Sequence, residues 1–135
     1  MLKITDHELR QKIDAALEHL GLTSAQYSVL SVIESGETMT SAELARKCFV
    51  SPQTMNRILQ NLEKDGFVKK SANPDHGLKL DYTFTNKAIK TLCDAHVAVN
   101  DIELKMVKGL SKKDIDTLQK LLDHGFKNLR KDSDT

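Results

Sequence analysis

The stretch from Ser51 to Gln60 carries side chains whose types suit contact with a nucleic acid. Amide and hydroxyl groups can both donate and accept hydrogen bonds, as base edges require, and they occur here at Gln53, Thr54, Asn56 and Gln60. Arg57 can pair with a guanine through two hydrogen bonds or hold a phosphate. Singly, each of these residues is ordinary helix surface, so the interpretation depends on their combination. Ser51 followed by Pro52 is typical of a helix start, where free N–H groups attract anions.

Basic side chains also occur in the segment that follows. Residues 67–71 form an expected strand, residues 73–77 are turn-rich, and residues 78–84 alternate apolar and polar side chains with a period of two. This pattern predicts a β-hairpin. Its candidate phosphate contacts are Lys69, Lys70, His76 and Lys79.

Both groups of residues fall in the basic third of the chain. The net charge of +1 divides into −3 over residues 1–39, +3 over residues 40–87 and +1 over residues 88–135. Capping patterns predict two short helices in this basic third, over residues 40–47 and 51–65. Two helices joined by a tight turn form a helix-turn-helix, whose second helix can enter the major groove. A hairpin placed directly after it would be a wing.

Long amphipathic helices are expected on either side of this segment. The first is predicted to begin at a capping box over residues 5–8 and carries Leu9, Ile13 and Leu17 on one face. The last carries an apolar stripe of Leu118, Leu122, Phe126 and Leu129. One small domain has little room to bury both stripes, so we expect a homodimer. The fold class expected is mainly α with a small β-hairpin: a winged helix-turn-helix lobe with N- and C-terminal dimerisation helices.

Four segments of the chain resemble the MarR-type winged-helix transcriptional regulators. They are Gly21–Leu30, Ala42–Ala45, Val50–Thr54 and Leu62–Val68, in this order and spacing. The resemblance implies a single domain over residues 1–135, with a DNA-binding lobe over about 23–85 and dimerisation helices over about 5–20 and 86–129. It also implies binding to palindromic operator DNA, usually as a repressor released by a small molecule or by oxidation.

Two positions depart from the pattern of that family. Leu78 stands where an Arg near the hairpin tip would enter the minor groove, so we expect His76 or Lys79 to hold a phosphate instead. Phe49 replaces a small residue, often Gly, in the turn between the two helices. It is tolerable there if its φ is negative.

The resemblance further implies a crevice for a small aromatic effector between the dimer helices and the DNA-binding lobe. By position, its candidate lining residues are His19, Gln26 and Tyr27. The alternative for Tyr27 is a core residue whose hydroxyl is satisfied within the protein.

Other classes of function find little support in the sequence. The two cysteines, Cys48 and Cys93, provide no disulfide framework, and neither has a neighbourhood that favours a reactive thiolate. We expect no cofactor, no metal site and no membrane span, and a cytoplasmic protein. No arrangement of catalytic groups occurs at motif spacing, so an enzyme is not expected. The alternative function is a winged-helix protein–protein interaction module with weak or no DNA binding.

Overall fold

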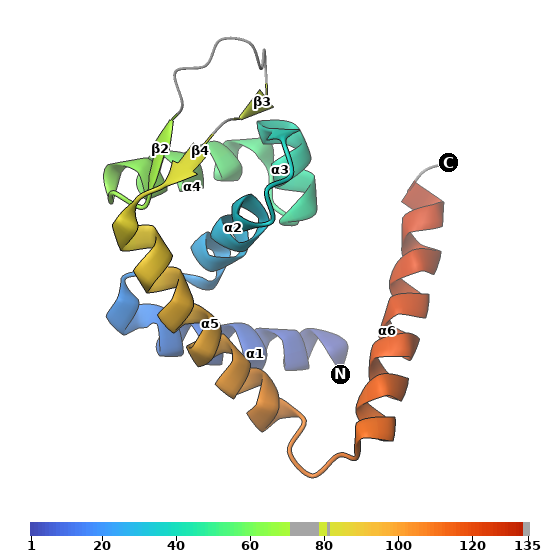
Figure 1. The fold of residues 1–135 in the computed structure, drawn as a ribbon. Helices are drawn as coiled ribbons and strands as arrows, with labels where there is room; N and C mark the ends of the chain where they lie inside the picture. The colour runs from blue at the N-terminus through green and yellow to red at the C-terminus, as the bar shows by residue number, and fades with distance from the viewer. Residues whose placement is uncertain (71–78, 81, 134–135) are drawn as a thin grey trace. The chain divides into compact units, whose positions relative to one another are not determined.

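The computed structural model describes residues 1–70, 79–80 and 82–133. Contacts divide the chain into two compact units, Met1–Ile102 and Glu103–Thr135. Helices predominate and the strands are short, as the sequence predicted. In chain order the elements in Figure 1 are α1 (Leu2–Leu17), η1 (Glu18–Leu20), α2 (Ser24–Glu34), β1 (Met39–Thr40), α3 (Ser41–Lys47), α4 (Pro52–Lys64), β2 (Val68–Lys70), β3 (Lys79–Leu80), β4 (Tyr82–Phe84), α5 (Asn86–Met106) and α6 (Lys112–Ser133).

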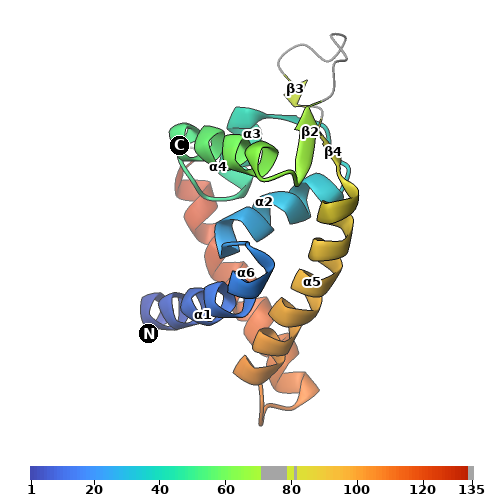
Figure 2. The ribbon, with the colours of Figure 1, turned by 90° about the vertical axis from the view of Figure 1, so that its left-hand side faces the viewer.

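The first unit has one apolar core, to which α1 to α5 and the strands contribute. Among the described residues no polar or charged side chain is buried. Helix α4 packs against α2 and α3, and strand β2 continues from its C-terminal end (Figure 2). The buried core residues are Leu17, Leu22, Val29, Leu30, Met39, Leu44, Ala45, Met55, Ile58, Leu59, Leu62, Phe67, Val68, Ala88, Leu92, Ala95 and Val99.

Local hydrogen bonds at the helix starts explain where most helices begin. Thr23 caps α2 in a reciprocal capping box with Gln26. Thr40 and Ser51 cap α3 and α4 by accepting from the backbone N–H three residues on. The predicted capping box at Thr5 is wrong. Helix α1 already begins at Leu2, and the Thr5 hydroxyl donates to the carbonyl of Met1, 2.9 Å away, as it does inside a helix.

The predicted hairpin is present and has an additional pairing. Strands β2 and β4 are antiparallel, with Lys69 opposite Thr83 and Lys70 opposite Tyr82. Strand β3 pairs instead with β1, which places Leu80 opposite Met39. The hairpin is therefore tied to the residues that lead into α3, and this connects the wing to the helix-turn-helix. The turn that contains His76 and Leu78 lies outside the described residues.

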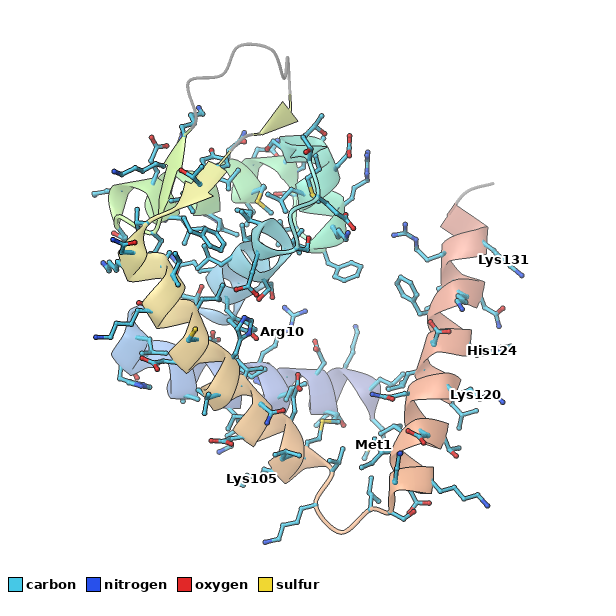
Figure 3. The ribbon with its side chains drawn as sticks, in the orientation of Figure 1. Met1, Arg10, Lys105, Lys120, His124 and Lys131 are labelled. Atoms are coloured by element: carbon cyan, nitrogen blue, oxygen red, sulfur yellow. The ribbon has the colours of Figure 1, made fainter. Side chains whose placement is uncertain are left out.

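The second unit consists mainly of α6. Ser111 and Asp114 cap its start reciprocally, since each side chain accepts from the other's backbone N–H. Lys120, His124 and Lys131 project from one face of the helix (Figure 3). The opposite face carries Leu122, Phe126 and Leu129, with Leu121 beside it, all of them exposed in the single chain. The helix is thus strongly amphipathic.

Candidate nucleic-acid interface

Helix α4 divides its side chains sharply between two faces. Met55 and Leu62 are fully buried, and Ile58 and Leu59 are nearly so. The outward face presents the exposed side chains of Gln53, Asn56, Arg57 and Gln60. Burial of four apolar side chains fixes the rotation of the helix about its axis. Four of the five polar side chains predicted for this face therefore reach solvent together, whereas Thr54 is half-buried.

The hydroxyls of Ser51 and Thr54 belong to the start of this helix. Ser51 Oγ accepts from the backbone N–H of Thr54 at 3.1 Å and donates to Thr54 Oγ1 at 2.9 Å. Thr54 is half-buried, whereas Ser51 is exposed. These two hydroxyls hold the first turn together: Ser51 satisfies the Thr54 N–H, and Pro52 contributes no N–H of its own.

Ser41 on α3 positions one of the outward side chains, which sequence reasoning missed. Its hydroxyl donates to Asn56 Oδ1 at 3.1 Å, between residues fifteen apart in the chain. The bond holds the Asn56 amide against α3 and leaves its nitrogen to donate. No sequence motif marks a pair at this spacing.

The turn between α3 and α4 contains a strained backbone. Phe49 has φ +58° and is 71% exposed. The condition on which Phe49 would be tolerable, a negative φ, is therefore not met. The left-handed region brings the Cβ atom close to the backbone and costs roughly 1–2 kcal/mol for residues other than Gly. The turn holds because Val50 N–H donates to the carbonyl of Ala45 at 3.0 Å, which closes the end of α3.

The basic residues of the hairpin are only partly described. Lys69 and Lys70 are exposed on β2, and because they are adjacent on a strand they face opposite sides of the hairpin. The backbone of Lys79 lies in β3, opposite Thr40. The side chain of Lys79 and the whole of His76 lie outside the described residues.

The far end of α4 is held by Thr85 and Lys87, a role that the sequence did not indicate for either residue. The Thr85 hydroxyl donates to the Gly66 carbonyl at 2.6 Å, and Lys87 Nζ donates to the Asp65 carbonyl at 2.8 Å. Lys87 Nζ also lies 4.6 Å from the centre of the Phe67 ring, a cation–π geometry. These contacts satisfy the carbonyls that end α4 and connect it to the start of α5.

Comparison with known proteins places this arrangement in a family. Residues 20–77 match the model of the MarR family. The HTH-type transcriptional repressor Rv2887 of Mycobacterium tuberculosis is 33% identical over 103 residues, which cover 76% of this chain and 74% of that protein. The chain belongs to the MarR family. The multiple antibiotic resistance protein MarR of Escherichia coli is 30% identical over 122 residues, covering 86% of this chain and 84% of that protein.

Solved structures of MarR-family proteins share the fold. The complex of Rv2887 with DNA has a TM-score of 0.71 at 29% identity and covers 91% of this chain and 92% of that one. The complex of Rv2887 with salicylic acid has a TM-score of 0.74 at 29% identity and covers 91% of each chain. The winged helix-turn-helix fold predicted from the sequence is confirmed.

Two of the three residues predicted to line an effector crevice in this MarR-family chain, Gln26 and Tyr27, have partners of their own. Gln26 Oε1 accepts from the backbone N–H of Thr23 at 3.0 Å, and His19 lies in η1. Tyr27 Oη lies 2.7 Å from His96 Nδ1 on α5. A ligand that used Gln26 or Tyr27 would therefore compete with existing hydrogen bonds.

His96 also contacts Glu34 of α2 through its other ring nitrogen. Its Nε2 lies 3.0 Å from Glu34 Oε1, and a carboxylate can only accept, so Nε2 is the donor. Tyr27, His96 and Glu34 thus form a chain of hydrogen bonds between α2 and α5.

The two cysteines lie in different surroundings in this MarR-family fold. Burial raises the pKa of the Cys48 thiol, and the neighbouring Lys47 ammonium lowers it by less. Cys48 packs against the core, so its thiol is largely protonated and unreactive near neutral pH. Cys93 is exposed on α5. Within the described part of the chain, no group of three or more potential metal ligands comes together, and no helix is both long and apolar enough to cross a membrane.

Proposed function

We propose that this chain is a transcriptional regulator that binds double-stranded DNA through α4 and the hairpin. The observation that carries the proposal is the outward face of α4. It presents Gln53, Asn56, Arg57 and Gln60 beyond a fully buried apolar face. Side chains of these types match the donor and acceptor pattern of the major groove. The structure of Rv2887 with DNA supports the same mode of action here.

The hairpin would contribute phosphate contacts. Lys69 and Lys70 are exposed on β2, directly after the end of α4. His76 and Lys79 are proposed as further contacts on the basis of their sequence positions. In this arrangement α4 reads bases while the hairpin fixes the protein on the DNA backbone.

A homodimer would suit this function. Helix α6 exposes the apolar side chains of Leu121, Leu122, Phe126 and Leu129 in the single chain, and α1 exposes Leu2 and Ile4. An exposed apolar stripe of the kind on α6 marks an interaction site. A two-fold mate would bury it and set two copies of α4 about 34–36 Å apart, one turn of DNA. The operator would then be palindromic, and its occupation would repress transcription.

We also propose that a small aromatic molecule releases the protein from DNA. The structure of Rv2887 with salicylic acid supports this proposal. His19, Gln26 and Tyr27 remain the proposed lining residues. A ligand bound at Tyr27 would replace His96 as the hydrogen-bond partner of the Tyr27 hydroxyl. It would thereby break a hydrogen bond that joins α2 to α5.

A binding titration on DNA tests the proposed function. Fluorescence anisotropy would compare duplexes that tile the DNA flanking the protein's own gene with scrambled duplexes, at two salt concentrations. We expect one duplex with a palindromic sequence to bind at least about 1,000-fold more tightly than scrambled DNA. Equal affinity for all duplexes would contradict sequence-specific regulation. No binding to any duplex at low salt would favour the alternative, a protein–protein interaction module.

A further inference from the structure

A cavity of about 100 Å³ lies in the first unit beside the end of α2. Helix α3 and strands β1 and β4 form its other sides. Its apolar wall comes from Val32, Met39 and Leu44, and its polar groups come from Glu37, Thr38 and Tyr82. No residue predicted to line an effector crevice takes part in it.

A second hollow adjoins this cavity. Ile33 and Tyr82 line both, and Glu34 and Phe84 complete the second. The two hollows are therefore neighbours that share Ile33 and Tyr82. Glu34 is also the residue that holds His96 of α5 at 3.0 Å.

The size of the cavity limits what it can hold. An engineered protein cavity of about 150 Å³ with aliphatic and aromatic walls binds benzene. The cavity of about 100 Å³ is smaller than this by itself, but together with the neighbouring hollow of about 200 Å³ it offers room for one ring with a short substituent. Apolar walls with a few polar groups at the rim are typical of small-molecule sites.

The charged side chains that line the two hollows determine which charge the substituent of a bound ring can carry. Among the residues that the structure describes, both charged side chains that line the two hollows are carboxylates, Glu37 and Glu34. Burial, with a further contribution from the Glu63 carboxylate, raises the pKa of the Tyr82 hydroxyl, so this group stays neutral.

One lysine is paired with one of these carboxylates, and another lies on the strand beside Tyr82. Lys47 Nζ pairs with Glu37 Oε2 at 2.6 Å, and Lys70 lies opposite Tyr82 on the neighbouring strand. Both partners of the ion pair are about half exposed, so the pair is weak and can be exchanged for another cation.

We propose that this cavity binds a small aromatic cation, a single ring that carries a primary ammonium group. The ring occupies the space between Val32, Met39 and Leu44, and the ammonium reaches Glu37 in place of Lys47. An aromatic carboxylate would meet Glu37 with its own negative charge and is excluded. The site therefore differs in both position and charge preference from the crevice proposed at Tyr27.

A ligand in the cavity would contact elements that support the proposed DNA-binding surface. Met39 belongs to β1, whose partner strand is β3, and Leu44 belongs to α3, which packs against α4. A ring wedged between these residues presses on both the base of the hairpin and the helix-turn-helix. An effector role for the ligand rests on the proposed function, whereas binding itself does not.

The direct test uses benzylamine, which carries an ammonium group at neutral pH, with benzyl alcohol and benzoate as matched neutral and anionic probes. Titrations followed by amide proton–nitrogen NMR spectra of the full chain report both affinity and site. We expect benzylamine to bind with a Kd of about 1 mM. Benzyl alcohol should bind about five-fold more weakly. Benzoate should not bind. Equal affinity for the three probes, or no benzylamine binding at ten times that concentration, overturns the proposal.

Variants of the two ion-pair partners should change the affinity for benzylamine in opposite directions. Glu37→Gln should weaken benzylamine binding about five-fold, because the counter-charge is lost. Lys47→Gln should strengthen it, because Glu37 loses its competing partner. A purely structural effect of breaking the pair would move both affinities in the same direction and would overturn the charge assignment.

A third variant tests the location. Thr38 is exposed at the rim, so Thr38→Phe should fill the cavity, abolish benzylamine binding and leave the melting temperature of the free protein nearly unchanged. Unaltered binding by this variant would place the ligand elsewhere and overturn the proposal. The DNA titration of the wild-type chain is scored separately. DNA binding without benzylamine binding refutes this inference alone, and benzylamine binding without DNA binding refutes the proposed function alone.

Discussion

Arg57 is the outward side chain of α4 best suited to distinguish one base from another. Its guanidinium is exposed, one helical turn from Gln53 and on the face opposite Met55. If it pairs with a guanine through two hydrogen bonds, Arg57→Ala should cost about 1–3 kcal/mol on the operator and much less on scrambled DNA. Anisotropy titrations on the two duplexes measure the difference. An equal loss on both would make Arg57 a phosphate contact and leave base reading to Gln53, Asn56 and Gln60.

Lys69 provides the matched control for Arg57. It is exposed on β2, where phosphates are the natural partners. Lys69→Ala should weaken binding to the operator and to scrambled DNA by the same factor. It should also lower the slope of log K against log salt by about one unit. If Lys69→Ala reduced operator binding alone, the hairpin would itself take part in base reading.

The backbone of Phe49 predicts an unusual order of stability among variants. Asn tolerates the left-handed region better than other residues with a Cβ atom, whereas Ala retains the strain. At φ +58° we therefore expect Phe49→Asn to be more stable than Phe49→Ala by about 0.5–1 kcal/mol. Both variants lose the phenyl ring, so their difference isolates the backbone. Urea denaturation measures it, and equal stability of the two variants would argue against strain at this turn.

At the scale of elements, Thr85 connects the end of α4 to the start of α5. Its hydroxyl donates to the Gly66 carbonyl at 2.6 Å and accepts from the Ala88 N–H at 3.2 Å. Thr85→Val preserves the shape and removes both bonds, and so should cost about 1–2 kcal/mol of unfolding free energy. Thr85→Ser retains the hydroxyl and should cost less, by the same urea measurement. If Thr85→Val were no more destabilising than Thr85→Ser, the hydrogen bonds of the Thr85 hydroxyl would not account for stability at this junction.

The helix starts also show which features a local sequence pattern can predict. Caps at Thr40 and Ser51 were predicted correctly because each joins groups three residues apart, a contact that the helix itself enforces. The box at Thr5 failed for a related reason. The pattern shows that a Thr can cap, and it does not show that the chain before it remains outside the helix.

At the scale of the whole molecule, the apolar face of α6 predicts a dimer that one charge can disrupt. Leu122→Glu places a carboxylate on the apolar face and should yield a monomer at micromolar concentration in a sedimentation run. His124→Glu adds the same charge on the opposite face (Figure 3) and should leave the dimer intact. A monomeric wild-type chain, or dissociation by both variants, would contradict dimerisation through this face.

The sequence by itself determined the elements and the character of their faces. The period of apolar residues in α4 decided which side is buried, so Gln53, Asn56, Arg57 and Gln60 could be assigned to the outward face without coordinates. The break to a period of two after Gly66 marked the hairpin. These faces can be predicted from the sequence because the geometry of a helix or a strand fixes which neighbouring residues share a face.

Only the tertiary structure decided the contacts between residues far apart in the chain. The bond from Ser41 to Asn56, the chain of Tyr27, His96 and Glu34, and the pairing of β1 with β3 join segments whose spacing carries no period. The positive φ of Phe49 belongs here as well, because the packing of α3 against α4 sets the path of the turn between them. Such contacts depend on how whole elements pack, and many sequences with the same local pattern could pack them differently.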